Sequence, residues 1–383
     1  MAKRRRVRLK TPPLLFEKTQ AVVRRIRPRV AGSFLTYWTS TSGSVCDNDV
    51  MAMHDILRAR GEQDTITLFL KSDGGSGMTS LRMVHLLRRY TKRLVVLAPL
   101  NCASAATMLA LGADAIAMGP LSYLTAVDTS LEHDLSPLDH TNQLVAVSND
   151  EVDRVIRLWK EAAGSPPPAR AAKSVRRLAK ALRRRRTPPA GTIPMGAPGD
   201  ASLKSASDAP VTADSVNPYQ ELYKYLHPLV VGSLDRASSL SLMLCREILG
   251  YHMKDTAKAE RISRQLNSSY PAHQYPITSR EAKRIGLNVV DLDPEVDLLL
   301  QELNLLYSEM GQRAITDYDE WNNHDNEITN ILEGDALQMF YQVEKDWHYR
   351  KEERRFVPMN DVSGWYRARK VKGRVVKQKF HIR

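Results

Sequence analysis

The sequence contains few cysteines, and it lacks long apolar runs and any spacing typical of metal ligands. Its 383 residues include 3 cysteines, Cys46, Cys102 and Cys245. This odd number argues against a disulfide framework. No apolar run approaches the roughly 18 to 20 residues that cross a bilayer. The basic start MAKRRRVRLK is not followed by the apolar stretch of a signal peptide. We therefore expect a cytoplasmic protein with no membrane span, no metal and no organic cofactor.

Acidic residues are missing from three strongly basic segments. Residues 1–10, 162–199 and 366–383 hold six, nine and eight Lys or Arg residues, and no Asp or Glu. The net charge of +13 belongs to these segments, since the rest of the chain carries a net charge of −10. Blocks of like charge are commonly flexible and solvated, and they attract nucleic acid or acidic surfaces. The segments therefore predict flexible regions that bind an acidic or nucleic-acid partner.

The first part of the chain alternates between strand and helix patterns. The predicted strands, rich in β-branched and aromatic residues, cover 32–40, 65–72, 93–100 and 115–119, with an extended segment over 122–128. The predicted helices, with apolar residues at helical spacing, cover 47–60, 78–90 and part of 101–114. Such alternation with short connections indicates an α/β fold with a mostly parallel sheet.

Changes in composition divide the chain into five parts. The predicted parts are a basic N-terminal tail (1–30), the first part of the α/β domain (31–163), an insertion (164–215), a helical second part (216–312) and an extension (313–383). The insertion is rich in Pro, Gly, Ser and Arg and has too few large apolar residues to fold, so we predict that it is disordered. Helices are predicted over 218–253, 258–269, 275–287 and 293–310. The extension is predicted to be helical from residue 315 and to end in a basic hairpin.

Two segments contain residues suited to chemistry. In LFLKSDGGSGM, a strand runs into Gly74 and Gly75 and then opens a helix, so bare backbone N–H groups lie near a helix N-terminus. In NCASAAT, Ser104 follows a strand and begins a helix among small alanines. A serine in this place is either a nucleophile or the N-cap of the helix. Cys102 lies nearby, but without a cysteine-hydrolase signature it reads as a small apolar filler.

The order of these segments resembles a known superfamily. The succession SDGGSG, helix, strand, CASAAT, helix and DAIAMGP is similar to the ClpP/crotonase superfamily. It looks closer still to the cytoplasmic, signal-peptide-peptidase-A-like serine peptidases called the serine dehydrogenase proteinase family. A later block, AHQYPITSREAKRIGL, also matches that family. The resemblance covers about residues 32–135 and 217–290, and it implies a ClpP/crotonase-like β-α superhelical domain.

The resemblance implies a role for each matching residue. Ser104 would be the nucleophile, and the N–H groups of Gly75, beside Gly74, and of Ala105 would form the oxyanion hole. Three departures from the family pattern stand out: Asp73 replaces a Pro, Ala106 replaces a Gly, and Thr129-Ser130 replaces Pro-Gln. The carboxylate of Asp73 is expected to disfavour negative charge that develops at the turn.

The general base is not fixed by the pattern. Clp-type subunits have a His near the position of Val127 and Asp128, where this chain has none. The candidate bases are His273, which matches the family's HDYPI segment, and Lys224, since signal-peptide-peptidase-type enzymes use a Lys. Asp128 is a candidate for orienting the base, or a turn residue. His273 could equally be a packed, hydrogen-bonded residue.

Two functions are consistent with the sequence. The first is an ATP-independent serine endopeptidase of the cytoplasm, acting on a peptide or protein substrate. The second is a catalytically inactive scaffold whose basic segments bind acidic partners or nucleic acid. A crotonase-like acyl-CoA enzyme is a third and more distant reading. The apolar stretch within 218–250 leaves few positions for a solvent face, so we also predict a homo-oligomer.

Overall fold

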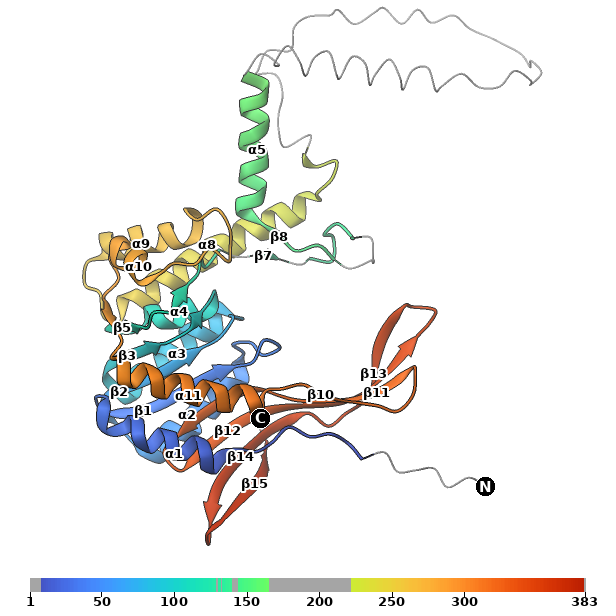
Figure 1. The fold of residues 1–383 in the computed structure, drawn as a ribbon. Helices are drawn as coiled ribbons and strands as arrows, with labels where there is room; N and C mark the ends of the chain where they lie inside the picture. The colour runs from blue at the N-terminus through green and yellow to red at the C-terminus, as the bar shows by residue number, and fades with distance from the viewer. Residues whose placement is uncertain (1–7, 129, 132, 140–143, 165–221, 382–383) are drawn as a thin grey trace, which may run out of the picture. The chain divides into compact units, whose positions relative to one another are not determined.

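The computed structural model describes residues 8–381 except 129, 132, 140–143 and 165–221 (Figure 1). It divides into two compact units. Unit 1 comprises Met1–Thr129 and Ala237–Arg383, and unit 2 comprises Ser130–Arg236. The boundary at Thr129 therefore falls inside the predicted domain part 31–163. The predicted disordered insertion lies outside the described residues, apart from Gly164.

A mixed sheet of eleven strands forms the centre of unit 1. Its order is β15-β14-β12-β11-β1-β2-β3-β5-β9, with β10 paired to β11 and β13 paired to β12. The strands are β1 (Ser33–Thr39), β2 (Gln63–Lys71), β3 (Thr91–Ala98), β5 (Ala115–Met118), β9 (Val289–Asp291), β10 (Ala314–Asp317), β11 (Asn322–Gly334), β12 (Leu337–Arg350), β13 (Arg355–Asp361), β14 (Gly364–Val371) and β15 (Arg374–Phe380). β1, β2, β3, β5 and β9 run parallel, and β11 joins β1 antiparallel. The α/β class is confirmed, but the sheet is parallel only in this half.

Helices cover both faces of the sheet. They are α1 (Phe16–Ile26), α2 (Asp47–Arg60), α3 (Gly77–Tyr90), α4 (Ala105–Leu111), α8 (Pro228–Gly250), α9 (Thr256–Ser268), α10 (Ser279–Ile285) and α11 (Pro294–Met310). On one face, α2, α3, α4, α9, α10 and the end of α8 contribute side chains to one core, which also contains Leu68 and Val96 of the sheet. On the other face, α1 and α11 lie side by side and pack on Phe69 and Leu97 (Figure 1). Strands covered on both faces are apolar in both orientations.

The helix predicted from residue 315 is wrong. The segment forms the long antiparallel strands β11 and β12, joined by a turn at Asp335–Ala336. Its apolar residues follow no two-residue alternation because both faces of β11, and of β12 near the turn, are buried. Leu332 and Met339 enter the core beneath α2, whereas Ile331 and Phe340 enter the core beneath α1 and α11. The predicted basic hairpin is present as β14 and β15, and it continues the main sheet.

Two further predictions need correction. The N-terminal tail predicted over 1–30 contains α1, whose Val23 and Ile26 are fully buried against the sheet. Residues 218–221 of the helix predicted over 218–253 lie outside the described residues. In the described part, a turn at 223–225 interrupts the predicted helix, and α8 runs from Pro228 to Gly250. α8 exposes Leu229 and Met243, and the homo-oligomer stays a prediction.

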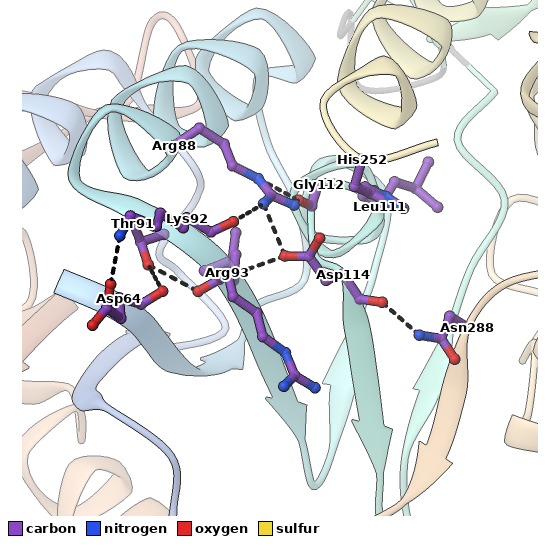
Figure 2. A network of polar contacts seen from close by, with 11 residues as sticks. Asp64, Arg88, Thr91, Lys92, Arg93, Leu111, Gly112, Asp114, His252 and Asn288 are labelled. Atoms are coloured by element: carbon purple, nitrogen blue, oxygen red, sulfur yellow. Dashed lines mark hydrogen bonds and ion pairs between the residues drawn. The ribbon is translucent and has the colours of Figure 1, made fainter. Parts of the chain in front are cut away.

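A polar network anchors the C-terminal end of α4 (Figure 2). Arg88 of α3 donates to the carbonyl oxygen of Gly112 (Nη2 to O, 2.6 Å) and to Asp114 (Nη1 to Oδ2, 2.8 Å). Asp114 Oδ2 also accepts the backbone N–H of Leu94 in β3 (2.7 Å). Asn288 donates from Nδ2 to the Asp114 carbonyl oxygen (2.6 Å). These bonds tie α4 to α3, β3 and the turn before β9, and so hold the helix that begins next to Ser104.

Unit 2 has a small core of its own. It contains β7 (Ser130–Leu131), β8 (Val147–Ser148), α5 (Asn149–Gly164) and the first part of α8. Val152 and Ile156 of α5 pack with Leu226 and Val230. Within the described ranges of both units, none of the helices combines the length and hydropathy that a membrane span requires.

Candidate active site

Ser104 occupies a strained turn between a strand and a helix. It follows β4 (Asn101–Cys102) and immediately precedes α4, with φ 52° and ψ −117°. A positive φ is unfavourable for a residue with a Cβ, and such strain is common where a serine is exposed on a strand-to-helix turn. Ser104 stands at the N-cap position, but its side chain makes no capping hydrogen bond. The hydroxyl therefore does not cap the helix.

Two threonines hold this turn in place. Thr125 Oγ1 accepts the backbone N–H of Ser104 (2.8 Å). Thr107 donates from Oγ1 to the carbonyl oxygen of Cys102 (2.6 Å) and accepts the backbone N–H of Thr125 (3.1 Å). Thr125 directly follows β6 (Tyr123–Leu124), which pairs in parallel with β4. The hydroxyl groups thus link the ends of two neighbouring strands, a role for Thr125 that the sequence did not reveal.

The Gly-Gly turn, defined here as Gly74 and Gly75, lies against Ser104. Both glycines have positive φ, 117° and 142°, which other residues rarely adopt. A Cβ placed on Gly74 would lie 2.7 Å from Ser104 Cβ and 3.3 Å from its Oγ. The two segments that the sequence singled out are therefore in contact, and only a glycine fits between them.

Two backbone N–H groups flank this contact, those of Gly75 and Ala105. Val45 and Gly75 form a parallel β-bridge. Its two hydrogen bonds join Val45 to the neighbours of Gly75, namely Gly74 and Ser76, and not to Gly75 itself. The N–H of Gly75 therefore points away from Val45. The N–H of Ala105 is the first of α4, where helices lack internal acceptors. In the part of the chain that the structure describes, neither N–H donates to an acceptor.

The carboxylate of Asp73 has partners near the turn. Asp73 is exposed and accepts a hydrogen bond from Asn101 Nδ2. Its negative charge also acts on Lys71, whose pKa is lowered mainly by burial and raised in part by Asp73. A hydrogen bond and a nearby cation reduce the field that a carboxylate exerts on its surroundings. Asp73 is therefore less unfavourable to a developing anion than its sequence position alone indicates.

The structure brings together His273 and Asp128. Their side chains make a hydrogen bond of 2.9 Å between Nδ1 and Oδ1. Leu124 and Ile277 form an antiparallel bridge. Four residues further along one segment and four residues back along the other, Asp128 and His273 face each other, which explains why they meet. The hydrogen bond to Asp128 raises the pKa of His273, opposed by partial burial. With Nδ1–H donating to Asp128, Nε2 is left able to accept a proton.

The two other candidate residues, Lys224 and Cys102, lie in environments different from that of Ser104. Lys224 lies in a turn of unit 2, so it is not part of the unit that carries Ser104. Cys102 is fully buried, and its thiol donates to the carbonyl oxygen of Leu70. Burial raises the pKa of Cys102 far above that of a free thiol, which makes it inert as a nucleophile. Among the described residues, no group of three or more His, Cys, Asp or Glu side chains could hold a metal ion.

No family model matches the chain, and no curated protein is similar to it. Two solved structures that it resembles are mutants of the membrane-bound stomatin-specific protease 1510-N. A lysine-to-alanine mutant in complex with a substrate peptide has a TM-score of 0.24 and 18% identity, over 35% of this chain and 61% of that chain. A serine-to-alanine mutant has a TM-score of 0.24 and 17% identity, over 34% and 63%. The chain thus spans less than two thirds of the length of the protease that it matches.

Proposed function

We propose that the chain is a serine peptidase that works without ATP in the cytoplasm. The observation that carries the proposal is the strained turn at Ser104, whose hydroxyl caps no helix and lies against Gly74. Strain of this kind persists only where the surrounding structure enforces it, and it gathers at sites of chemistry. The free N–H groups of Gly75 and Ala105 beside the same turn supply what an oxyanion needs.

The proposed reaction assigns one role to each group. Ser104 Oγ attacks the peptide carbonyl carbon and gives its proton to the general base. The carbonyl oxygen becomes an oxyanion that accepts from the N–H groups of Gly75 and Ala105. The C–N bond then breaks, the amine leaves with the proton from the base, and water hydrolyses the acyl-enzyme. His273, oriented by Asp128, is the preferred base because their side chains already make a hydrogen bond, and Lys224 is the second candidate.

Covalent labelling tests the proposal. A fluorophosphonate probe is expected to add once to the wild-type protein, at Ser104, and labelling of Ser104→Ala is expected to fall by about 1000-fold or more. The matched control is Ser268→Ala, an exposed serine at the end of α9, which should label as wild type. Intact mass and peptide mapping measure the adduct. Equal labelling of wild type and Ser104→Ala would refute the peptidase. The same assay on His273→Ala and Lys224→Ala decides between the bases.

A second candidate function is nucleic-acid binding by a scaffold, and the β14–β15 hairpin favours it. The hairpin forms one edge of the sheet. Its exposed cations are Arg369, Lys370, Lys372, Arg374, Lys377 and Lys379. Lys370 makes an ion pair with Glu17 of α1 (3.0 Å). Lys377 lies 4.1 Å from the ring centre of Tyr366, and an aromatic ring beside cations is suited to stacking on unpaired bases.

Neutralising the hairpin tests the second candidate. Replacing Arg369, Arg374, Lys377 and Lys379 by Gln should weaken binding of a single-stranded oligonucleotide about 10-fold and flatten its salt dependence, because phosphate contacts release counterions. Fluorescence anisotropy at several salt concentrations measures both effects. The control variant carries the same change at four exposed cations elsewhere in unit 1, Arg89, Lys254, Arg261 and Arg280. Equal weakening in both variants would show that only the overall charge matters.

A further inference from the structure

The backbone of one short segment holds the Gly-Gly turn. This holding segment, residues 44–46, precedes α2. The N–H of Val45 donates to the carbonyl oxygen of Gly74 (2.7 Å), and the N–H of Ser76 donates to that of Val45 (2.9 Å). A Cβ on Gly75 would lie 2.5 Å from both the N and the O of Val45. The direction of the Gly75 N–H therefore depends on where the holding segment lies.

Three buried side chains fix the holding segment. Asp49 is fully buried and accepts hydrogen bonds from the Tyr37 hydroxyl and from the backbone N–H of Cys46 (2.8 Å). Asn330 donates from Nδ2 to the carbonyl oxygen of Ser44 (2.8 Å) and to Asp49 Oδ1 (2.9 Å). The amide of Asn330 thus joins one end of the holding segment to the carboxylate that binds its other end.

Asn330 belongs to the C-terminal extension, far from the site in sequence. It lies on β11, and the register between β11 and β12 shifts between Ile328 and Asn330. A bulge of this kind turns side chains away from the regular pleat and is common next to active sites. Asn330 is 3% exposed, so its bonds are shielded from water.

The burial of Asp49 carries a cost that grows with pH. Burial raises the pKa of Asp49 from 3.8 to about 6, despite the three donors. A carboxyl group whose pKa is raised on folding contributes less to stability as the pH rises from about 4 to about 6, and the loss persists at neutral pH. A fully buried carboxyl group that is hydrogen-bonded on the holding segment, although its contribution falls toward neutral pH, is consistent with a requirement for precise placement.

We propose that Asp49, Tyr37 and Asn330 are positioning residues that hold the oxyanion N–H of Gly75 through the holding segment, so that strand β11 of the extension is required for acylation of Ser104. This inference rests on the proposed peptidase function. The three side chains need not touch a substrate. They act through Val45, whose backbone sets the geometry of the turn. Losing an oxyanion donor, or displacing it by about 1 Å, costs on the order of 100-fold in rate.

The test compares two buried asparagines of the same strand. Asn330→Ala is expected to lower the maximal rate of Ser104 inactivation by the fluorophosphonate probe by about 10- to 100-fold, with the probe's apparent dissociation constant changed less than about twofold. The matched control is Asn326→Ala, since Asn326 is 1% exposed and its side chain, among the described residues, bonds only to Gln342 (2.6 Å). Its rate should stay within about twofold of wild type. Asp49→Asn should slow the rate as well, and the double variant should lose no more than the worse single one, because both residues act in one network.

Hydrogen exchange gives a readout that does not depend on activity. In Asn330→Ala, the amides of Val45 and Ser76 should exchange at least about 10-fold faster than in wild type, and in Asn326→Ala they should not. Unchanged exchange at both amides, or an unchanged rate of inactivation in Asn330→Ala, would overturn the inference. If wild-type Ser104 takes no probe, the peptidase proposal fails, while the exchange comparison still decides whether Asn330 holds the turn.

Discussion

Replacing Gly74 by alanine is expected to slow fluorophosphonate labelling of Ser104 by about 100-fold or more. The added methyl group would lie 2.7 Å from Ser104 Cβ and 3.1 Å from the carbonyl oxygen of Ala103. Ser104 cannot yield easily, because the hydroxyl of Thr125 holds its backbone N–H. Either the Gly-Gly turn or the nucleophile must therefore move, and a displacement of about 1 Å at a reacting group typically costs about 100-fold in rate.

A second glycine provides a control that distinguishes the effect of this clash from the effect of backbone strain. Gly373 also has a positive φ, 81°, but a Cβ there would meet nothing within 4 Å. Gly373→Ala should therefore lower stability slightly, by about 1 kcal/mol, and leave the labelling rate unchanged. Labelling reactions quenched at successive times give the labelling rate of both variants, and circular dichroism confirms that both are folded. Normal labelling of a folded Gly74→Ala protein would mean that the contact between the turn and Ser104 does not matter for reactivity.

The local parts of the site could be predicted because their signals are local. Gly-Gly after a buried strand and Ser104 between small residues are patterns within a few positions, and the structure places these segments in contact. The helix over 47–60 was predicted with the bounds that the structure gives. His273 and Asp128 were each predicted as candidates, and their hydrogen bond depends on a pairing of segments 145 residues apart.

The supporting residues could not be predicted because they act through the fold. Asn330 reads as one polar residue in a segment whose apolar spacing resembled a helix. Its position on β11, beside the holding segment, follows only from the antiparallel pairing of β1 with β11. Thr125 likewise gains its role from the neighbouring ends of β4 and β6. Burial of a strand on both faces removes the two-residue pattern on which strand prediction relies.

Replacing Glu333 by alanine is expected to destabilise unit 1 by about 3 to 5 kcal/mol. Glu333 lies on β11 and is 1% exposed. Its two carboxyl oxygens accept hydrogen bonds of 2.6 to 2.8 Å from four side chains, namely Thr19 and Gln20 of α1, Tyr307 of α11 and Gln338 of β12. Alanine would leave these donors without their acceptor inside a closed core. Urea unfolding followed by tryptophan fluorescence measures the change.

The pH dependence of the free energy of unfolding distinguishes the effect of the Glu333 carboxyl group from the effect of the volume of its side chain. Burial raises the pKa of Glu333 above its ordinary value, with the four donors opposing the rise. The folded state therefore holds the proton more tightly than the unfolded state, and the contribution of Glu333 to stability falls as the pH rises through the interval between the two pKa values. Glu333→Gln keeps the volume and one acceptor oxygen, so it should cost less than alanine, and the difference in stability between it and wild type should vary over that pH interval.

Glu309→Ala, at an exposed position of α11, should stay within about 0.5 kcal/mol of wild type at every pH. A Glu333→Ala protein as stable as the Glu309→Ala control would mean that α1, α11 and the β11–β12 hairpin are held together by their apolar contacts alone.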